Sequence, residues 1–149
     1  MMTKTDAIEL LKKMISIPSF SREEGKMADL MVETLQKHGY TASRKGNNVW
    51  AKSKDWDENK PVILLDAHID TVRPNGNWDT DPFTPVVKDG KLFGLGSNDT
   101  GGSVVSMLTA FLHLTAKPQP YNLIWLASAE EENTGKGGIQ SVLNELGRV

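Results

Sequence analysis

The sequence contains no cysteine, which excludes a disulfide framework and any thiolate site. Neither sign of charge dominates: 17 basic and 19 acidic residues give a net charge of −2, and no basic stripe is present, which argues against nucleic acid as a partner. No apolar run approaches the length of a membrane span, and the amino terminus carries no signal-peptide core. We therefore expect a cytoplasmic protein without membrane attachment.

The composition that remains is that of a soluble globular protein, with 38% hydrophobic and 24% charged residues. At 149 residues the chain lies in the size range of a single domain, and it contains no repeat or low-complexity tract. Apolar residues at helical spacing predict a first helix over 7–15, which ends before Pro18, and a second over 27–35. Ser21 and Glu24, three residues apart, predict a capping box that opens the second helix.

Helices and strands alternate along the rest of the chain. Short strands are expected at 41–44 and 48–51, followed by a longer apolar strand within 61–72, an irregular loop and another strand. A helix over 104–114, a strand over 121–129 and a final helix over 138–146 complete the pattern. This order predicts an α/β fold with a mainly parallel sheet flanked by helices.

The strongest functional signal is the apolar run 61–72, which places His68 and Asp70 at its carboxyl end. Residues two apart in an extended chain lie on one face, so the carboxylate can orient the imidazole. A histidine held by a carboxylate is typical of metal sites. The alternative for an isolated His-x-Asp is a histidine hydrogen-bonded for structural reasons.

Two further segments place acidic residues at the predicted start of a helix and at the carboxyl end of a predicted strand. Asp99 lies in a loop with glycines on both sides, 94–102, just before the helix over 104–114, where the helix dipole favours a carboxylate; its alternative role is an N-cap. The strand over 121–129 ends in Glu130, Glu131 and Glu132. Acidic runs are often solvated loops, but ligands of α/β sheets collect at the carboxyl ends of strands. His68, Asp99 and the Glu131/Glu132 pair would supply nitrogen and oxygen ligands that suit zinc or a similar divalent ion.

Three ordered motifs carry a family resemblance: residues 68–72, 94–102 and 129–132. With them, the chain resembles the zinc-dependent amidohydrolase and exopeptidase family that includes acetylornithine deacetylase, succinyl-diaminopimelate desuccinylase and glutamate carboxypeptidase. Segments 46–50, 81–85 and 135–139 look most like the acetylornithine or acetylcitrulline deacetylase branch, which implies a role in arginine biosynthesis. The fold that this implies is a zinc-peptidase-like, phosphorylase/hydrolase-like catalytic domain.

The resemblance also implies roles for particular residues. His68 would bind one metal ion, Asp99 would bridge two, and Glu132 would bind the other. Asp70 would orient His68, and Glu131 would be the general base that takes a proton from the attacking water. The implied cofactor is zinc, two ions in the full-length enzyme, with cobalt or manganese as alternatives. The implied substrate is a small N-acyl amino acid, and the full-length enzyme could be a homodimer.

By the same resemblance, residues 1–149 are the amino-terminal part of the catalytic domain. The lid or dimerisation domain and the carboxyl-terminal part, with two more metal ligands, would be absent. The other histidines do not replace these ligands, because His38 reads as a helix-end cation and His113 as the flank of a packed helix. We therefore expect little or no hydrolysis by this chain alone. The alternatives are a dipeptidase or tripeptidase of the same family, a non-catalytic truncated product that binds metal weakly, or a flavodoxin-like nucleotide-binding domain.

Overall fold

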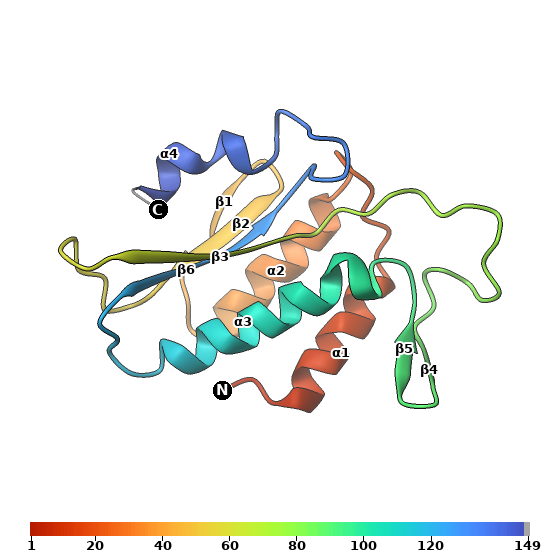
Figure 1. Ribbon diagram of the computed structural model, residues 1–149, viewed down its shortest axis with the longest axis horizontal. Coiled ribbons are helices and arrows are strands. Elements are labelled where there is room, and N and C mark those ends of the chain that lie inside the picture. Colours follow the sequence, from red (N-terminus) through yellow and green to blue (C-terminus); the bar gives the residue numbers. More distant parts are fainter. Residues whose placement is uncertain (148–149) are drawn as a thin grey trace.

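Helices and strands alternate around one four-stranded sheet in the computed structural model, which describes residues 1–147 (Figure 1). In chain order the elements are α1 (Lys4–Ile15), α2 (Gly25–Lys37), β1 (Ser43–Lys45), β2 (Asn48–Lys52), β3 (Val62–His68), β4 (Val86–Lys88), β5 (Lys91–Phe93), the helical turn η1 (Ser97–Gly101), α3 (Gly102–Leu114), β6 (Asn122–Ser128), the 3-10 turn η2 (Ile139–Ser141) and α4 (Leu143–Leu146). Within the described residues, no helix has the length and apolar composition that crossing a membrane requires.

The strands of the main sheet follow the order β1-β2-β6-β3. β3 and β6 run parallel, with Val62 opposite Asn122 and His68 opposite Ser128, and α3 lies between them in the chain. β1 pairs with β2, and β2 with β6, in antiparallel fashion. The predicted α/β fold is confirmed, but the sheet is mixed rather than mainly parallel. The two-residue connection between β1 and β2 permits only an antiparallel hairpin, whereas the long crossover through α3 allows a parallel pair.

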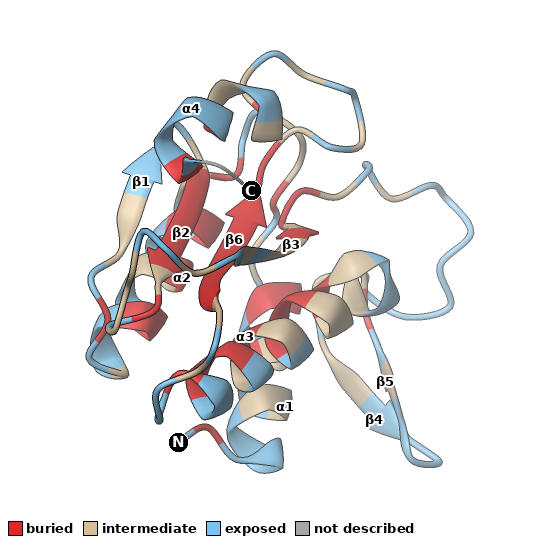
Figure 2. Cartoon of the chain, turned by 60° about the vertical axis from the view of Figure 1, so that its left-hand side comes forward, coloured by how far each residue is buried: buried red, intermediate tan, exposed pale blue. Residues whose placement is uncertain are grey.

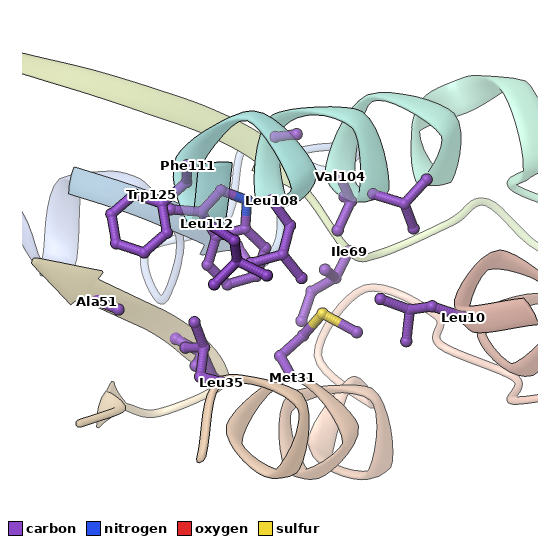
Figure 3. Packing of buried hydrophobic residues seen from close by; sticks show 14 of the residues in the cluster. Leu10, Met31, Leu35, Ala51, Ile69, Val104, Leu108, Phe111, Leu112 and Trp125 are labelled. Atoms are coloured by element: carbon purple, nitrogen blue, oxygen red, sulfur yellow. The ribbon is translucent and has the colours of Figure 1, made fainter. Parts of the chain in front are cut away.

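Helices cover both faces of this sheet. α1, α2 and α3 pack on one face and α4 on the other (Figure 1). Alternate residues of β6 point to opposite layers: Leu123, Trp125 and Ala127 join the larger core, and Ile124 and Leu126 join the smaller one. All seven residues of β6 are buried, as Figure 2 shows, and Figure 3 shows Trp125 packed beside Phe111 and Leu112 of α3. β6 is therefore a fully buried inner strand, and the loop after it starts from a well-packed position.

The predicted helix α1 is present, but the predicted start of α2 is wrong. α1 lies where the apolar spacing predicts it and begins with a capping box between Thr3 and Asp6. The capping box predicted for the second helix is wrong: α2 begins at Gly25, Glu24 occupies the N-cap position, and its side chain makes no capping hydrogen bond. Ser21 and Glu24 both bind groups outside the helix, as described below. The single helix expected over 138–146 is divided into η2 and α4.

The segment before α3 contains a small hairpin in place of the single strand that the sequence predicts. β4 and β5 pair antiparallel and form a sheet of their own. Their turn holds Asp89 and Gly90, both with positive φ (53° and 73°), the conformation that two-residue hairpin turns prefer. The hairpin lies beside the amino-terminal end of α3 (Figure 1).

Candidate metal centre

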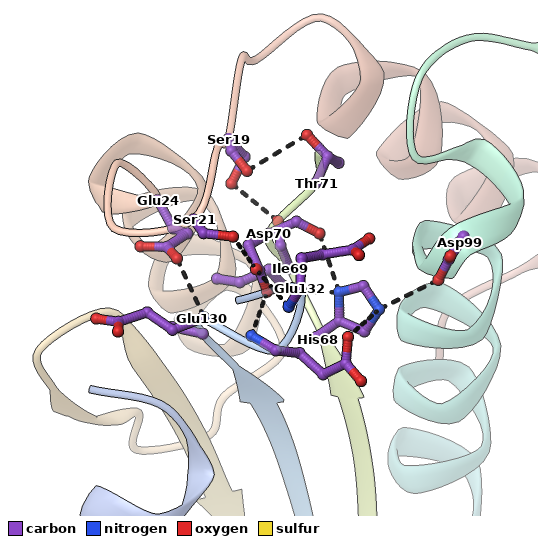
Figure 4. A network of polar contacts seen from close by, with 12 residues as sticks. Ser19, Ser21, Glu24, His68, Ile69, Asp70, Thr71, Asp99, Glu130 and Glu132 are labelled. Carbon is purple, nitrogen blue, oxygen red and sulfur yellow. Dashed lines mark hydrogen bonds and ion pairs between the residues drawn. The ribbon is translucent and has the colours of Figure 1, made fainter. Parts of the chain in front are cut away.

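The candidate site lies at the carboxyl ends of the parallel strands β3 and β6. Because His68 is opposite Ser128 in the register, the residues that follow the two strands leave the sheet side by side. The turn η1, which precedes α3, adds Asp99 from a third direction (Figure 4). The structure thus brings together all five predicted site residues: His68, Asp70, Asp99, Glu131 and Glu132.

The hydrogen bonds of His68 fix its ring orientation. Nδ1 lies 2.9 Å from the backbone carbonyl oxygen of Asp70, which can only accept, so Nδ1 donates. The other ring nitrogen, Nε2, lies 3.2 Å from Oδ1 of Asp99 and 3.6 Å from Oε2 of Glu131. In this tautomer Nε2 is free to act as a metal ligand. The sequence suggested that the Asp70 carboxylate orients the ring, but the carbonyl of the same residue makes the closer contact, since Oδ1 lies at 3.4 Å.

Asp70 is fully buried, and its carboxylate joins three segments of the chain. Oδ1 accepts a hydrogen bond from the backbone N–H of Glu131 at 3.0 Å. Oδ2 accepts one from the N–H of Glu132 at 3.1 Å and one from the Ser21 hydroxyl at 2.6 Å. Burial alone would raise the pKa of Asp70, but these hydrogen bonds and the contact with His68 outweigh it and lower the pKa to about 2. Asp70 is therefore ionised at neutral pH, at the base of the site.

Ser21 reaches Asp70 because residues 19–21 run parallel to residues 69–71. Phe20 and Thr71 form an isolated β-bridge, and the Thr71 N–H donates to the Ser19 carbonyl at 2.8 Å. The Ser19 hydroxyl donates to the carbonyl of Ile69, also at 2.8 Å. No local sequence pattern predicts this pairing, because a serine in front of a helix is typical of a helix cap. Only the fold places it beside a residue 49 positions away.

Asp99 lies in the irregular turn η1 and does not cap α3. Its backbone is non-helical, the N-cap position of α3 belongs to Gly101, and the Asp99 side chain is 75% exposed. Gly101 allows this turn to pack closely, because a Cβ there would lie 2.7 Å from both the Gly96 carbonyl oxygen and Cδ1 of Leu11. The glycines around Asp99 thus bring a loop against α1 and hold the carboxylate over His68.

His68, Asp99 and Glu132 each offer one ligand atom, and these atoms all lie within 4.8 Å of one another. One imidazole nitrogen and two carboxylate oxygens form a donor set that suits a divalent ion such as zinc. Burial and the neighbouring charge of Asp99 raise the pKa of Glu132. Burial disfavours the imidazolium of His68, but its hydrogen bonds to Asp70 and the charges of Asp70 and Glu131 outweigh this and raise the pKa to about 9. Several carboxylates lie close together here, and they keep a proton on the histidine. A bound cation would stabilise such an environment.

The remaining acids and histidines have distinct positions. The Glu131 side chain is 61% exposed and faces the solvent side of His68, so a water molecule can reach both. Glu130 has a positive φ of 56° and turns its side chain back toward Gly137, whose N–H it accepts at 3.3 Å. His38 is the C-cap of α2 and His113 is exposed in the last turn of α3, and neither belongs to the ligand cluster among residues 1–147.

Glu24, which the sequence predicts as part of a helix capping box, is a buried residue near the site. Glu24 has no exposed surface and accepts hydrogen bonds from the backbone of Arg22 and Glu130 and from the side chain of Asn47. As with Ser21, an acid in front of an amphipathic helix reads as a helix-start signal. A single sequence offers no pattern that would have indicated these long-range contacts.

The fold and the cluster define an α/β protein in which one histidine and two carboxylates that could hold a divalent ion gather at the carboxyl ends of two parallel strands. The family profile described as Peptidase family M20/M25/M40 matches residues 64–148, and the chain belongs to this family of metal-dependent amide hydrolases. The succinyl-diaminopimelate desuccinylase of Buchnera aphidicola subsp. Cinara cedri is 34% identical over 151 residues, which cover 95% of this chain and 39% of that protein. The chain thus spans about two fifths of the length of the curated relatives it matches.

Solved structures show the same fold. Human carnosine dipeptidase 1 superposes with a TM-score of 0.76 at 21% identity, over 95% of this chain and 35% of that one. The Bacillus subtilis YXEP protein, described as a dinuclear metal-binding peptidase of family M20, superposes with a TM-score of 0.66 at 19% identity, over 94% of this chain and 38% of that one. At these identities the likeness establishes the fold alone.

Proposed function

We propose that this protein is the metal-binding part of an enzyme that hydrolyses the amide bond of an N-acyl amino acid. The observation that carries the proposal is the convergence of His68, Asp99 and Glu132 within 4.8 Å, with the exposed carboxylate of Glu131 beside them. Membership of the M20 family and 34% identity to a desuccinylase of N-acylated diaminopimelate support amide hydrolysis.

In the proposed reaction, His68, Asp99 and Glu132 hold a divalent ion, for which zinc is the first candidate and cobalt or manganese are alternatives. Such an ion, when bound, lowers the pKa of water and polarises a carbonyl group. Two ions in the complete enzyme, with Asp99 between them, would match the dinuclear description of the Bacillus subtilis relative. Within residues 1–147 the cluster supplies three ligands, so we expect one ion to bind to this chain and little or no turnover by the chain alone.

Glu131 is the proposed general base. Its Oε2 lies 3.6 Å from Nε2 of His68 and is open to solvent, so a water held over the ligand cluster is within its reach. Glu131 would take the proton from the attacking water and deliver it to the leaving amine. Asp70 would take no part in the proton transfer, because its carboxylate is buried and fully occupied by Ser21 and the two backbone N–H groups.

The test is an assay of the native gene product, purified with zinc and identified by its intact mass. We expect hydrolysis of N-acetylornithine or N-acetylcitrulline, with N-succinyl-diaminopimelate as the matched acyl substrate and an unblocked dipeptide as the comparison. Cleavage of the dipeptide with no activity on the three acylated substrates would replace the deacylase proposal with a dipeptidase. A native product that binds no divalent ion would overturn both.

A further inference from the structure

Glu24 is a fully buried carboxylate that the proposed reaction does not use. Oε1 accepts hydrogen bonds from the backbone N–H of Arg22 at 2.7 Å and of Glu130 at 3.1 Å. Oε2 accepts one from Nδ2 of Asn47 at 2.8 Å. Burial of a carboxylate is costly unless its oxygens are hydrogen-bonded, and these three donors provide that stabilisation. Glu24 therefore joins the start of α2, the β1–β2 turn and the loop after β6.

Three successive backbone N–H groups after β6 each have a buried carboxylate as partner. The N–H of Glu130 donates to Glu24, and those of Glu131 and Glu132 donate to Asp70 (Figure 4). Asp70 comes from the end of β3, whereas Glu24 comes from the front of α2. The direction of the backbone that carries the base and a metal ligand is therefore fixed from two sides.

The Glu130 end of this loop needs such support. Glu130 has a positive φ of 56°, which is unfavourable for a residue with a side chain. It also turns the chain sharply, so that a Cβ at Gly135 or Gly137 would collide with the Glu130 side chain. A conformation of this kind persists where surrounding contacts hold it. The hydrogen bond from the Glu130 N–H to Glu24 is one such contact.

We propose that Glu24 is a positioning residue of the metal centre: by accepting the Glu130 N–H, it sets the path of the loop that presents Glu131 and Glu132 to His68 and Asp99. This inference rests on the proposed function. The proposed effect depends on the length of the Glu24 side chain, because the two donors to Oε1 are backbone groups that cannot rotate toward a displaced acceptor.

Two substitutions distinguish the effect of the length of the Glu24 side chain from the effect of its charge. Glu24→Gln keeps the length and an oxygen for the Arg22 and Glu130 N–H groups. Asn47 can turn its amide oxygen to face the new NH₂ group, at the loss of its exposed hydrogen bond from Arg44. Glu24→Asp keeps the charge but is one methylene shorter. Tyr40→Phe is the control for lost stability, since it removes a buried hydrogen bond to Thr115 at the opposite end of α3 from Asp99.

The experiment measures the dissociation constant for Zn²⁺ of the 149-residue chain by competition with a chromophoric chelator, and the hydrogen exchange rate of the Glu130 amide by NMR. We expect Glu24→Asp to weaken zinc binding by about tenfold or more, as for other residues that support metal ligands. In the same variant the Glu130 amide should exchange at least about tenfold faster. Glu24→Gln and Tyr40→Phe should each bind zinc within about threefold of the unchanged chain.

Folded Glu24→Asp that binds zinc as tightly as the unchanged chain would overturn the proposal, and so would an equal loss in Tyr40→Phe. If Glu24→Asp does not fold, Glu24→Gln decides, because a tenfold loss in that folded variant would mean that charge rather than length matters. An unchanged chain that binds no zinc would instead contradict the proposed function. In that case the Glu130 exchange rate still tests whether Glu24 holds the loop.

Discussion

The carboxylate of Asp70 accepts a hydrogen bond from the backbone N–H of Glu131, with 3.0 Å between Oδ1 and the nitrogen. The carbonyl of the same Asp70 holds Nδ1 of His68. One buried residue thus orients the His68 ring at the end of β3 and anchors the acidic loop after β6. The relative position of imidazole and carboxylates therefore depends on Asp70.

Replacing Asp70 by Asn should disturb both strand ends. The amide has one acceptor oxygen where the carboxylate has two, so one of the backbone N–H groups of Glu131 and Glu132 would lose its partner. We expect the free energy of unfolding to fall by about 1–3 kcal/mol and zinc binding to weaken by about 10–100-fold. Urea denaturation and zinc titration measure the two effects. Asp29→Asn, which changes a surface ion pair with Arg44, is the control and should alter stability by less than about 1 kcal/mol.

Replacing Asp99 by Ala should abolish metal binding while leaving the metal-free fold nearly unchanged. The side chain is 75% exposed, so its loss should change the free energy of unfolding by no more than about 0.5 kcal/mol. Excess Zn²⁺ at about 100 times the dissociation constant should stabilise the unchanged chain by about 2.7 kcal/mol, and this stabilisation should disappear in the variant. Thermal denaturation with zinc or with EDTA measures it. Asp79→Ala, on an exposed loop, should keep the full response to zinc.

Replacing Glu131 by Gln should separate metal binding from turnover. The variant keeps His68, Asp99 and Glu132, so its affinity for zinc should stay within about threefold of the unchanged protein. Turnover by the native product should fall by about 10²–10⁴-fold, the usual contribution of a positioned general base. Glu132→Gln is the matched comparison and should lose metal as well as activity. Near-normal turnover in Glu131→Gln would show that another group takes the proton.

The stability of the metal-free chain should depend on pH through His68 and Asp70. The pKa of His68 is raised from 6.5 to about 9 in the folded state, so its contribution is complete below pH 6.5 and is lost as the pH rises through 9. The pKa of Asp70 is lowered from 3.8 to about 2, so its contribution is present above pH 3.8 and is lost as the pH falls through 2. Urea denaturation in EDTA should therefore show a falling free energy of unfolding from pH 6.5 to 9.

Two histidine variants identify the group responsible for the alkaline part of this profile. His68→Gln should remove the decrease between pH 6.5 and 9, whereas His113→Gln, an exposed position on α3, should retain it. Persistence of the decrease in His68→Gln would assign it to another group.

Much of the site could be predicted because its signals are local. A continuous apolar run and a terminal His-x-Asp identify β3, glycines around Asp99 mark a tight turn before α3, and an acidic run marks the end of β6. The α/β fold follows from the order of these elements. The direction of each strand pair does not follow from that order, because the β1–β2 hairpin pairs with β6 only when the cores on both faces of the sheet form.

The sequence by itself determined which residue types stand at strand ends and helix starts, and therefore the chemistry available: one imidazole and several carboxylates suited to a divalent ion. Tertiary structure alone decided how they are held. Ser21 and Glu24 have the local pattern of a helix start, yet one binds Asp70 and the other the N–H of Glu130, 49 and 106 residues away. Hydrogen bonds across such separations depend on how segments pack, which no local pattern of residues encodes.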